Sequence, residues 1–221
     1  MDKDEFYRDI LEGLAVYTRS AFQRDVLATL TRCDNPALAE ALNKNQIASK
    51  LWLADALFDA VGAGVGSVLV LGGWLGVLPA ILLHDARFNI AHVTSLDIDP
   101  RCEPVALALN DTHVRSGKFA AVTADMLEVD YARGTSAADE APKLIVNTSC
   151  EHIEAFDRWY RRIPDRQLLA LQTNDYFACS EHVNCVPDLA SFQRQAPMRD
   201  VLFAGERALR RYVRFMLIGR K

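Results

Sequence analysis

Two polar clusters in the second half of the chain hold the residue types that acid–base chemistry needs. The first reads Asn-Thr-Ser-Cys-Glu-His-Ile over 147–153, and the second, over 174–182, ends in another Glu-His pair. Histidine titrates close to neutral pH, so His152 could accept a proton from a substrate while Glu151 orients its ring. We therefore predict His152 and Glu151 as catalytic residues, with a hydrogen-bonded loop residue as the equal alternative for each histidine. The side chains expected to bind a substrate are Ser149, Asn174, Tyr176 and His182.

A metal site is another use for these Glu-His pairs, because His and Glu are common ligands of zinc and iron. Adjacent residues on a strand or helix point away from each other, so Glu151 and His152 are not expected to bind one ion together. The sequence also lacks an H-x-x-x-H spacing. We predict no metal site, and an ion held between His152 and His182 from the two loops stays an open alternative.

A strand–turn–helix pattern near the middle of the chain must position these clusters. Residues 68–71 form an apolar run, typical of a strand buried on both faces, and two glycines follow it. A helix is predicted over 77–86, and residues 93–96 predict a second strand that ends on Asp97 and Asp99. Such a glycine turn, with an acidic residue about twenty positions later, suits an adenosine-type ligand, because the carboxylate can accept hydrogen bonds from ribose hydroxyls.

This stretch resembles the class I S-adenosylmethionine-dependent methyltransferases, whose first strand usually reads Val-Leu-Asp-Leu-Gly-x-Gly-x-Gly. Gly72 and Gly76 match the outer glycines, and Asp97 matches the acid that binds the ribose. Val70 stands in place of the usual acidic residue, and Trp74 stands in place of the middle glycine. Proteins that bind nicotinamide dinucleotides need G-x-G-x-x-G, which these glycines do not supply in any register.

The resemblance implies S-adenosyl-L-methionine as the cofactor. In the family, an acidic residue after the third strand bonds the adenine amino group and the next residue packs on the ring, and Asp125 and Met126 take these positions here. Asp125 could instead cap the turn that follows it. Asn147 matches the Asn of the Asn-Pro-Pro-aromatic element of amino-group methyltransferases. The residues thereby assigned to the cofactor are Gly72, Gly73, Trp74, Gly76, Asp97, Ile98, Asp125, Met126 and Asn147.

The remaining elements alternate in the way that predicts an α/β fold. The helices expected before the first strand span 4–31, as one or two segments, and 35–62, with a break near Asn43. Those expected later in the chain are a helix over 101–116, a helix over 154–163, and strands over 120–124, 144–146, 167–172, 201–205 and 212–219.

The domain organisation follows from this order. We predict an N-terminal helical extension over residues 1–64 and a Rossmann-like methyltransferase domain over 65–221. As in the resembled family, the sheet should be seven-stranded, mostly parallel and doubly wound, with an antiparallel last strand. Residues 131–142 are rich in Ala, Gly, Ser and Asp and predict an irregular surface loop.

The amino-acid composition indicates the class of protein and the compartment in which it works. Half of the residues are hydrophobic and the formal net charge is −4, as in an ordinary globular protein. The five cysteines contain no C-x-x-C pair, so neither a disulfide framework nor a zinc ribbon is indicated. The longest apolar run, over 68–83, is too short for a membrane span, and no signal-peptide pattern follows the acidic start. We expect a cytoplasmic protein without a membrane partner.

The most direct functional interpretation is methyl transfer from S-adenosylmethionine to an oxygen or nitrogen of a small-molecule substrate. An RNA or protein target is one alternative, because residues 194–221 carry eight basic residues and only two acidic ones. The overall negative charge nevertheless argues against a nucleic-acid partner. A protein that binds the cofactor without methylating is the other alternative, given Val70 and Trp74. The sequence leaves open a homodimer, the substrate and the methylated atom.

Overall fold

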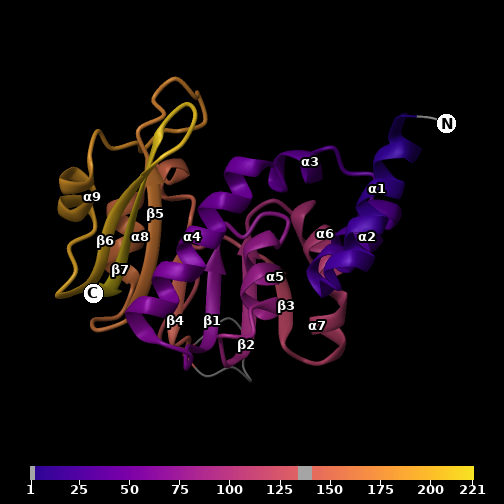
Figure 1. The fold of residues 1–221 in the computed structure, drawn as a ribbon. Coiled ribbons are helices and arrows are strands. Elements are labelled where there is room, and N and C mark those ends of the chain that lie inside the picture. Colours follow the sequence, from indigo (N-terminus) through magenta and orange to yellow (C-terminus); the bar gives the residue numbers. More distant parts are fainter. Residues whose placement is uncertain (1–2, 134–140) are drawn as a thin grey trace.

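A seven-stranded sheet with strand order β3-β2-β1-β4-β5-β7-β6 forms the centre of the computed structural model, which describes residues 3–133 and 141–221 (Figure 1). Strands β1 to β5 are parallel to one another, and β7 runs antiparallel to both β5 and β6. This confirms the predicted fold class. The strands are β1 (Gly66–Leu71), β2 (Ile90–Asp97), β3 (Phe119–Thr123), β4 (Leu144–Asn147), β5 (Leu168–Asn174), β6 (Asp200–Ala208) and β7 (Val213–Arg220).

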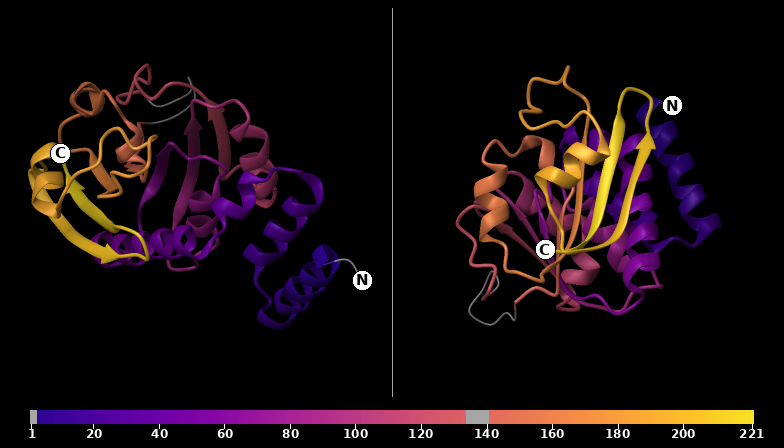
Figure 2. Two further views of the ribbon diagram at one scale, coloured as in Figure 1. Left: turned by 90° about the horizontal axis from the view of Figure 1, so that it is seen from above. Right: turned by 90° about the vertical axis from the view of Figure 1, so that its left-hand side faces the viewer.

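In the described part of the chain, four helices precede the first strand: α1 (Lys3–Thr18), α2 (Ala21–Arg32), α3 (Ala37–Ala41) and α4 (Lys44–Val61). The N-terminal pair lies at the opposite end of the molecule from the β6–β7 hairpin (Figures 1 and 2). The break expected near Asn43 is present, because the Asn43 side chain caps α4 by accepting from the backbone N–H groups of Asn45 and Gln46, each at 2.9 Å. The division into an extension and a domain at residue 64 stays a prediction.

The later helices are α5 (Val77–His84), α6 (Cys102–Leu109), α7 (Asp111–Arg115), the 3-10 helix η1 (Cys150–His152), α8 (Phe156–Arg162) and α9 (Leu189–Gln195). The single helix expected over 101–116 is therefore wrong. Asn110 separates α6 from α7, and its buried side chain donates to the carbonyls of Ala106 at 2.9 Å and Gly76 at 3.1 Å. Asparagine favours such local bonds over helix continuation. Of the predicted loop over 131–142, residues 134–140 lie outside the described residues.

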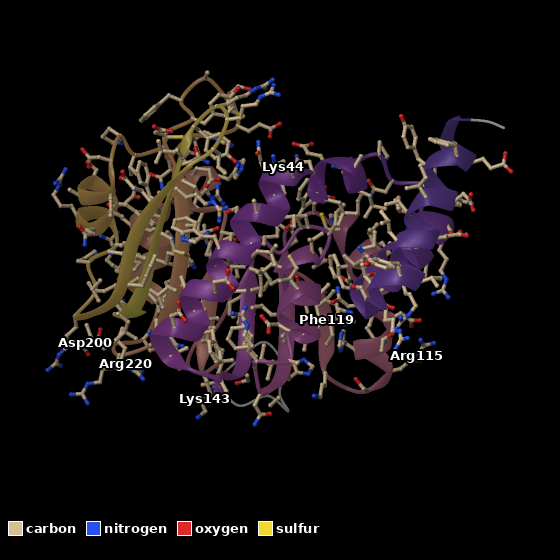
Figure 3. All side chains as sticks on the ribbon, viewed as in Figure 1. Lys44, Arg115, Phe119, Lys143, Asp200 and Arg220 are labelled. Carbon is tan, nitrogen blue, oxygen red and sulfur yellow. The ribbon has the colours of Figure 1, made fainter. Side chains whose placement is uncertain are left out.

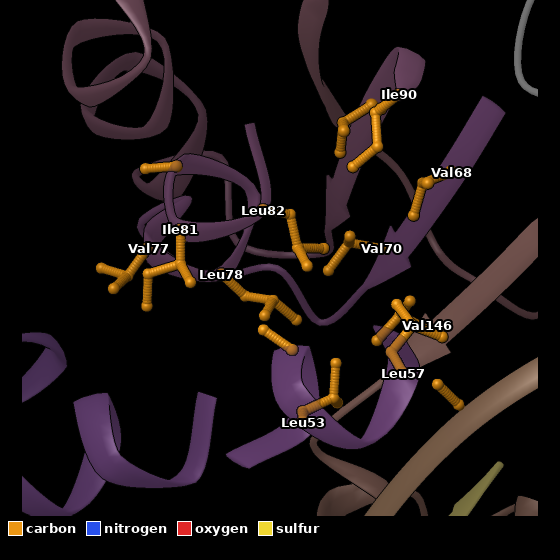
Figure 4. Close-up of a cluster of buried hydrophobic side chains, with 14 of the residues drawn as sticks. Leu53, Leu57, Val68, Val70, Val77, Leu78, Ile81, Leu82, Ile90 and Val146 are labelled. Carbon is orange, nitrogen blue, oxygen red and sulfur yellow. The ribbon is translucent and has the colours of Figure 1, made fainter. Parts of the chain in front are cut away.

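Alternate strand residues build two hydrophobic cores, one on each face of the sheet. Val68, Val70 and Val146 face α4 and α5, where Leu53 and Leu57 pack against them (Figure 4). The opposite core includes Leu69, Leu71 and Ile145, covered by Phe156 and Trp159 of α8. Full burial of one such leucine stabilises the fold by about 1.5–3 kcal/mol. Helices on both faces explain the unbroken apolar runs in the sequence.

All parallel strands end at the same edge of the sheet. Figure 3 shows the starts of β4 and β6 near Lys143 and Asp200, beside Arg220 at the end of antiparallel β7. Lys44, in the first turn of α4, lies at the other edge, where the parallel strands end. Ligands in open α/β sheets bind outside the carboxyl ends of the strands, so the site belongs at the Lys44 edge. In the described part of the chain no helix is long and apolar enough to cross a membrane.

The turn after β1 adopts a backbone that favours glycine. Gly72 has φ +58° and Gly76 has φ +75°, both in the left-handed region. Trp74 also has a positive φ of +48°, at the place where the resembled family has a glycine. A bulky residue there costs on the order of 1–2 kcal/mol, so the surrounding contacts must hold it.

Close packing fixes the turn against β2. The backbone N–H of Gly73 donates to the Leu96 carbonyl at 3.0 Å, and a Cβ built on Gly73 would overlap Ser95 Oγ. Ser95 is buried, with 3% of its surface exposed, so its side chain has little room to move away. Glycine at position 73 is therefore required by contact with β2.

We expect Gly73→Ala to lower the free energy of unfolding by about 1–3 kcal/mol, the usual cost of overpacking a tight site. In a Ser95→Ala background, which lacks the hydroxyl, adding Gly73→Ala should lower the free energy of unfolding much less. The comparison is between the Gly73→Ala/Ser95→Ala double variant and Ser95→Ala alone. Urea unfolding monitored by circular dichroism measures both changes. Gly64→Ala, where an added Cβ would meet open space, is the matched control. Equal stabilities of Gly73→Ala and Gly64→Ala would contradict the packing argument.

Candidate active site

A cavity of about 1260 Å³ opens at the carboxyl edge of the parallel strands. The β1 turn and the end of β2 form one wall, which includes Gly72, Trp74 and Asp97. A second wall comes from α4, η1, the loop after β5 and the β6–β7 hairpin. Small-molecule sites typically measure about 300–1,000 Å³, so this cavity has room for a cofactor and a second molecule together.

Backbone N–H groups of two other residues hold the Asp97 carboxylate in place at the first wall. Its Oδ2 accepts from the Trp74 N–H at 2.8 Å and its Oδ1 accepts from the Asp99 N–H at 3.0 Å. Each carboxylate oxygen can accept a further hydrogen bond. Apolar Ile98, which is 69% exposed, and Met126 also line this part of the cavity. A fixed carboxylate that accepts hydrogen bonds, beside apolar side chains, fits the ribose hydroxyls and the base of an adenosine-type ligand.

The other residues that the resemblance assigned to the cofactor lie close to this wall in the fold. Asp125 Oδ1 accepts from the Leu127 N–H at 2.8 Å. At least this oxygen therefore caps the following turn, as the alternative prediction has it. Buried Asn147 accepts from the Ser149 N–H at 2.9 Å. Gly76, Asp125 and Asn147 are not among the described residues that line the cavity, whereas Gly72, Gly73, Trp74, Asp97, Ile98 and Met126 are. Cofactor binding by each of them stays a prediction.

The second wall is organised by a buried ion pair. Glu151, 3% exposed, accepts at Oε1 from Arg214 Nη1 at 2.6 Å and from Asn174 Nδ2 at 2.8 Å. Arg214 Nη2 also donates to the Thr148 carbonyl. The β5–β7 register places Asn174 directly beside Arg214. Asn174, predicted to bind substrate, thus holds Glu151 in position while also lining the cavity.

Sequence reasoning missed Arg214. Its signal was a charged residue within the apolar strand β7, because arginine is almost never buried unless it has a charged partner. Arg214 is 8% exposed. Three more arginines of the same hairpin line the cavity: Arg207, Arg210 and Arg211.

Lys50 of α4 lies in the cavity wall close to this ion pair. Its Nζ donates to Gln46 Oε1 at 2.6 Å, one helical turn earlier. Burial, and secondarily the charge of Arg214, lowers the Lys50 pKa to about 7, although Glu151 opposes the shift. A lysine titrating near neutral pH is uncommon and is found most often at functional sites.

Two histidines from different loops meet in the cavity. The His152 and His182 ring centroids lie 4.6 Å apart with an interplanar angle of 88°. His152 Nδ1 lies 3.0 Å from the Glu181 carbonyl, and Tyr176 packs edge-on against His182 at 5.8 Å. Burial lowers the pKa of His182, which favours its neutral ring. The predicted loops therefore converge, and Ser149 lines the same cavity.

Asn184 connects the two loops. Its backbone N–H donates to the Glu151 carbonyl at 2.8 Å, and its side-chain Nδ2 donates to the Cys150 carbonyl at 2.9 Å. These bonds fix the loop after β5 against η1, so the His152–His182 contact does not depend on the ring packing alone.

The expectation that Glu151 and His152 point apart is wrong. Each offers one metal-ligating atom, and these atoms, together with one from His182, all lie within 4.8 Å of one another. The expectation applied the alternation rule of regular strands and helices, whereas both residues lie in the short 3-10 helix η1. Their side chains are long enough to reach the same cavity from this turn.

Comparison with known proteins supports the fold and little beyond it. No protein-family model and no curated protein matches the sequence. The N-methyltransferase NodS from Bradyrhizobium japonicum WM9, in complex with S-adenosyl-L-homocysteine, matches with a TM-score of 0.60 and 13% identity over 90% of this chain and 96% of NodS. The chain has the class I methyltransferase fold. This confirms the fold that the resemblance implied.

Two further solved structures also match the fold of this chain. The magnesium protoporphyrin IX methyltransferase ChlM from Synechocystis PCC 6803, with bound S-adenosylmethionine, matches over 100% of this chain and 98% of its own, with a TM-score of 0.52 and 14% identity. The [4+2]-cyclase SpnF matches with a TM-score of 0.62 and 11% identity over 82% of this chain and 84% of SpnF. A fold shared with a cyclase does not fix the reaction, which must be argued from the site.

The lowered Lys50 pKa predicts a pH-dependent stability. Between pH 7 and 10.5 the unfolded chain binds a proton at Lys50 that the folded chain does not, so stability falls as the pH falls through this range. From about pH 9.5 to pH 7 the loss should be about 2–3 kcal/mol, at 1.36 kcal/mol per pKa unit.

Urea unfolding at both pH values tests this expectation. Lys50→Met should remove that part of the pH dependence, and Lys44→Met, at an exposed position in the same helix, should keep it. If Lys50→Met and the wild type show the same pH dependence, Lys50 does not have a lowered pKa.

Proposed function

We propose that this chain is an S-adenosylmethionine-dependent methyltransferase that acts on an oxygen or nitrogen of a small molecule. One observation carries the proposal: the glycine turn and Asp97 face the same cavity as Glu151, His152 and His182. The first wall has the groups that recognise an adenosine, and the second wall has groups that bind and deprotonate a polar substrate. The fold adds support, because class I proteins such as NodS have been crystallised with S-adenosyl-L-homocysteine.

The cofactor fits the first wall on chemical grounds. Asp97 would accept hydrogen bonds from the ribose hydroxyls, and Ile98 and Met126 would contact the base. Bound there, S-adenosylmethionine supplies a methyl group on a positively charged sulfur. In the overall reaction the C–S bond breaks, a C–O or C–N bond forms, and the nucleophile loses a proton, which leaves S-adenosylhomocysteine and a methylated product.

The chain's own contribution is to position the nucleophile and remove its proton. His152 has the ring to accept that proton, and its Nδ1 is already engaged with the Glu181 carbonyl, which leaves Nε2 available. Tyr176, Ser149 and His182 would hold the substrate beside it. Because Arg207, Arg210 and Arg211 line the same cavity, the substrate should carry a negative charge.

Asp97→Ala should weaken binding of S-adenosylhomocysteine by about 1.5–3 kcal/mol, the scale of hydrogen bonds to a charged group. Isothermal titration calorimetry measures the change. Asp99→Ala is the matched control, because Asp99 pairs with Arg101 at 2.7 Å on the surface and does not belong to the cavity lining described above. A folded Asp97→Ala protein with wild-type affinity would refute the assignment of the ribose site.

His152→Ala should lower turnover by about 100-fold or more while cofactor affinity stays nearly unchanged. The assay is release of S-adenosylhomocysteine in a screen of small amines, carboxylic acids and phenols. His92→Ala, whose ring contacts the Gly117 carbonyl away from the cavity, controls for the loss of a histidine. Normal turnover in His152→Ala would move the proton acceptor to His182.

RNA is the second candidate substrate, favoured by the arginines of the β6–β7 hairpin. Phosphate contacts release counterions, so binding of RNA would weaken steeply with added salt. Turnover on RNA with none in the small-molecule screen would favour this candidate. Tight cofactor binding without turnover on either class would favour a protein that does not methylate.

A further inference from the structure

A three-residue cluster in the cavity has the composition of a metal site. Glu151 and His152 come from η1, and His182 comes from the loop after β5. One ligand atom from each lies within 4.8 Å of the other two. We propose that Glu151, His152 and His182 bind a divalent first-row transition-metal ion. This replaces the sequence-based prediction of no metal site.

Two buried atoms in this cluster need a partner. Glu151 Oε2 and His182 Nδ1 are buried, and neither has a hydrogen-bond partner among the described residues. Glu151 is 97% buried, since only 3% of its surface is exposed. Leaving such groups without a partner is unfavourable, and more so for a charged group. Both atoms belong to residues of the cluster, and a bound cation is a partner that each of them can accept.

The contacts around the cluster orient the ligands. Glu151 Oε1 is occupied by Arg214 and Asn174, which leaves Oε2 for the ion. His152 Nδ1 lies 3.0 Å from the Glu181 carbonyl, so it carries the proton and Nε2 has the free lone pair. Metal-binding histidines almost always donate their other N–H to a carbonyl or carboxylate in this way.

The ligand types select the class of metal. Two imidazoles and one carboxylate suit zinc, ferrous iron and related ions, whereas magnesium prefers oxygen ligands. Ligand atoms about 2.1 Å from one tetrahedral ion lie about 3.4 Å apart, so side-chain rotations that bring the three atoms closer together would complete the site. Arg214 and Lys50 add positive charge nearby, but Arg214 is paired with Glu151 and Lys50 titrates near pH 7.

Three protein ligands leave coordination positions open to the cavity, as in catalytic rather than structural sites. This part of the inference rests on the proposed methyltransferase function. It narrows the substrate to a molecule with two neighbouring oxygen or nitrogen donors that can chelate the ion beside the nucleophile. His152 would then be a metal ligand instead of the proton acceptor: the ion would lower the pKa of the nucleophile, and the proton would pass to a water molecule in the open cavity.

Calorimetric titration of Zn²⁺ into metal-free, tag-free protein tests the site directly. We expect one equivalent to bind, with affinity at least about tenfold lower in His152→Ala and in His182→Ala and little binding of Mg²⁺ to the wild type. His113→Ala is the matched control, because His84 and His113 form a similar ring pair at 4.6 Å on another face. Failure of the wild type to bind Zn²⁺, or equal loss in His113→Ala, would overturn the proposal.

A measurement on the wild type guards against variants that fail to fold. Paramagnetic Co²⁺ should shift or broaden the NMR signals of the His152 and His182 rings and leave those of the other three histidines sharp. Broadening of a different set of rings would also overturn the metal site. Titration of S-adenosylhomocysteine into the metal-free protein separates the two hypotheses. A protein that binds Zn²⁺ but not S-adenosylhomocysteine refutes the proposed function alone. A protein that binds S-adenosylhomocysteine but not Zn²⁺ refutes the metal site alone.

Discussion

The second wall of the cavity depends on the buried ion pair between Glu151 and Arg214. The pair joins η1, which follows β4, to β7 at the far side of β5, and Asn174 of β5 bonds the same carboxylate oxygen. Removing one partner of a buried pair costs about 3–5 kcal/mol, because the other charge is left without compensation. Two loops and a hairpin that are distant in sequence therefore hold one geometry, and this geometry places Glu151, His152 and His182 together in the cavity lining.

The same ion pair acts on the titration of Lys50. Burial is the main cause that lowers the Lys50 pKa to about 7, the charge of Arg214 adds to it, and the charge of Glu151 opposes it more weakly. Any anion that enters the cavity would favour protonated Lys50, and any cation would favour neutral Lys50. Lys50 can thus adjust its charge to the ligand, whereas the paired Arg214 cannot. The second wall therefore combines the fixed charges of the Glu151–Arg214 pair with one group, Lys50, whose charge can change.

The sequence predicted the parts of this structure that follow from local patterns. The apolar runs and glycines around β1 identified the strand, the turn and the position of Asp97, because each rests on neighbouring residues. It did not predict Arg214, whose partner lies 63 positions away in sequence. The break at Asn110 was missed for a similar reason, since one of its two bonds reaches Gly76 from another element. The convergence of Glu151 with His152 was missed because periodicity rules do not describe a 3-10 helix of three residues.

The residues that match the methyltransferase pattern and those that depart from it have different places in the structure. Gly72, Gly73 and Gly76 remain where the backbone has positive φ or packs against a neighbouring strand, so the turn itself is preserved. Val70 and Trp74 both line the cavity. Trp74 keeps the left-handed backbone without being glycine, and its side chain packs against the buried core, which offsets the strain. Residues 70 and 74 therefore form part of the surface that a ligand meets, while the turn keeps its backbone, so the fold that this chain shares with structures at 11–14% identity does not fix its chemistry.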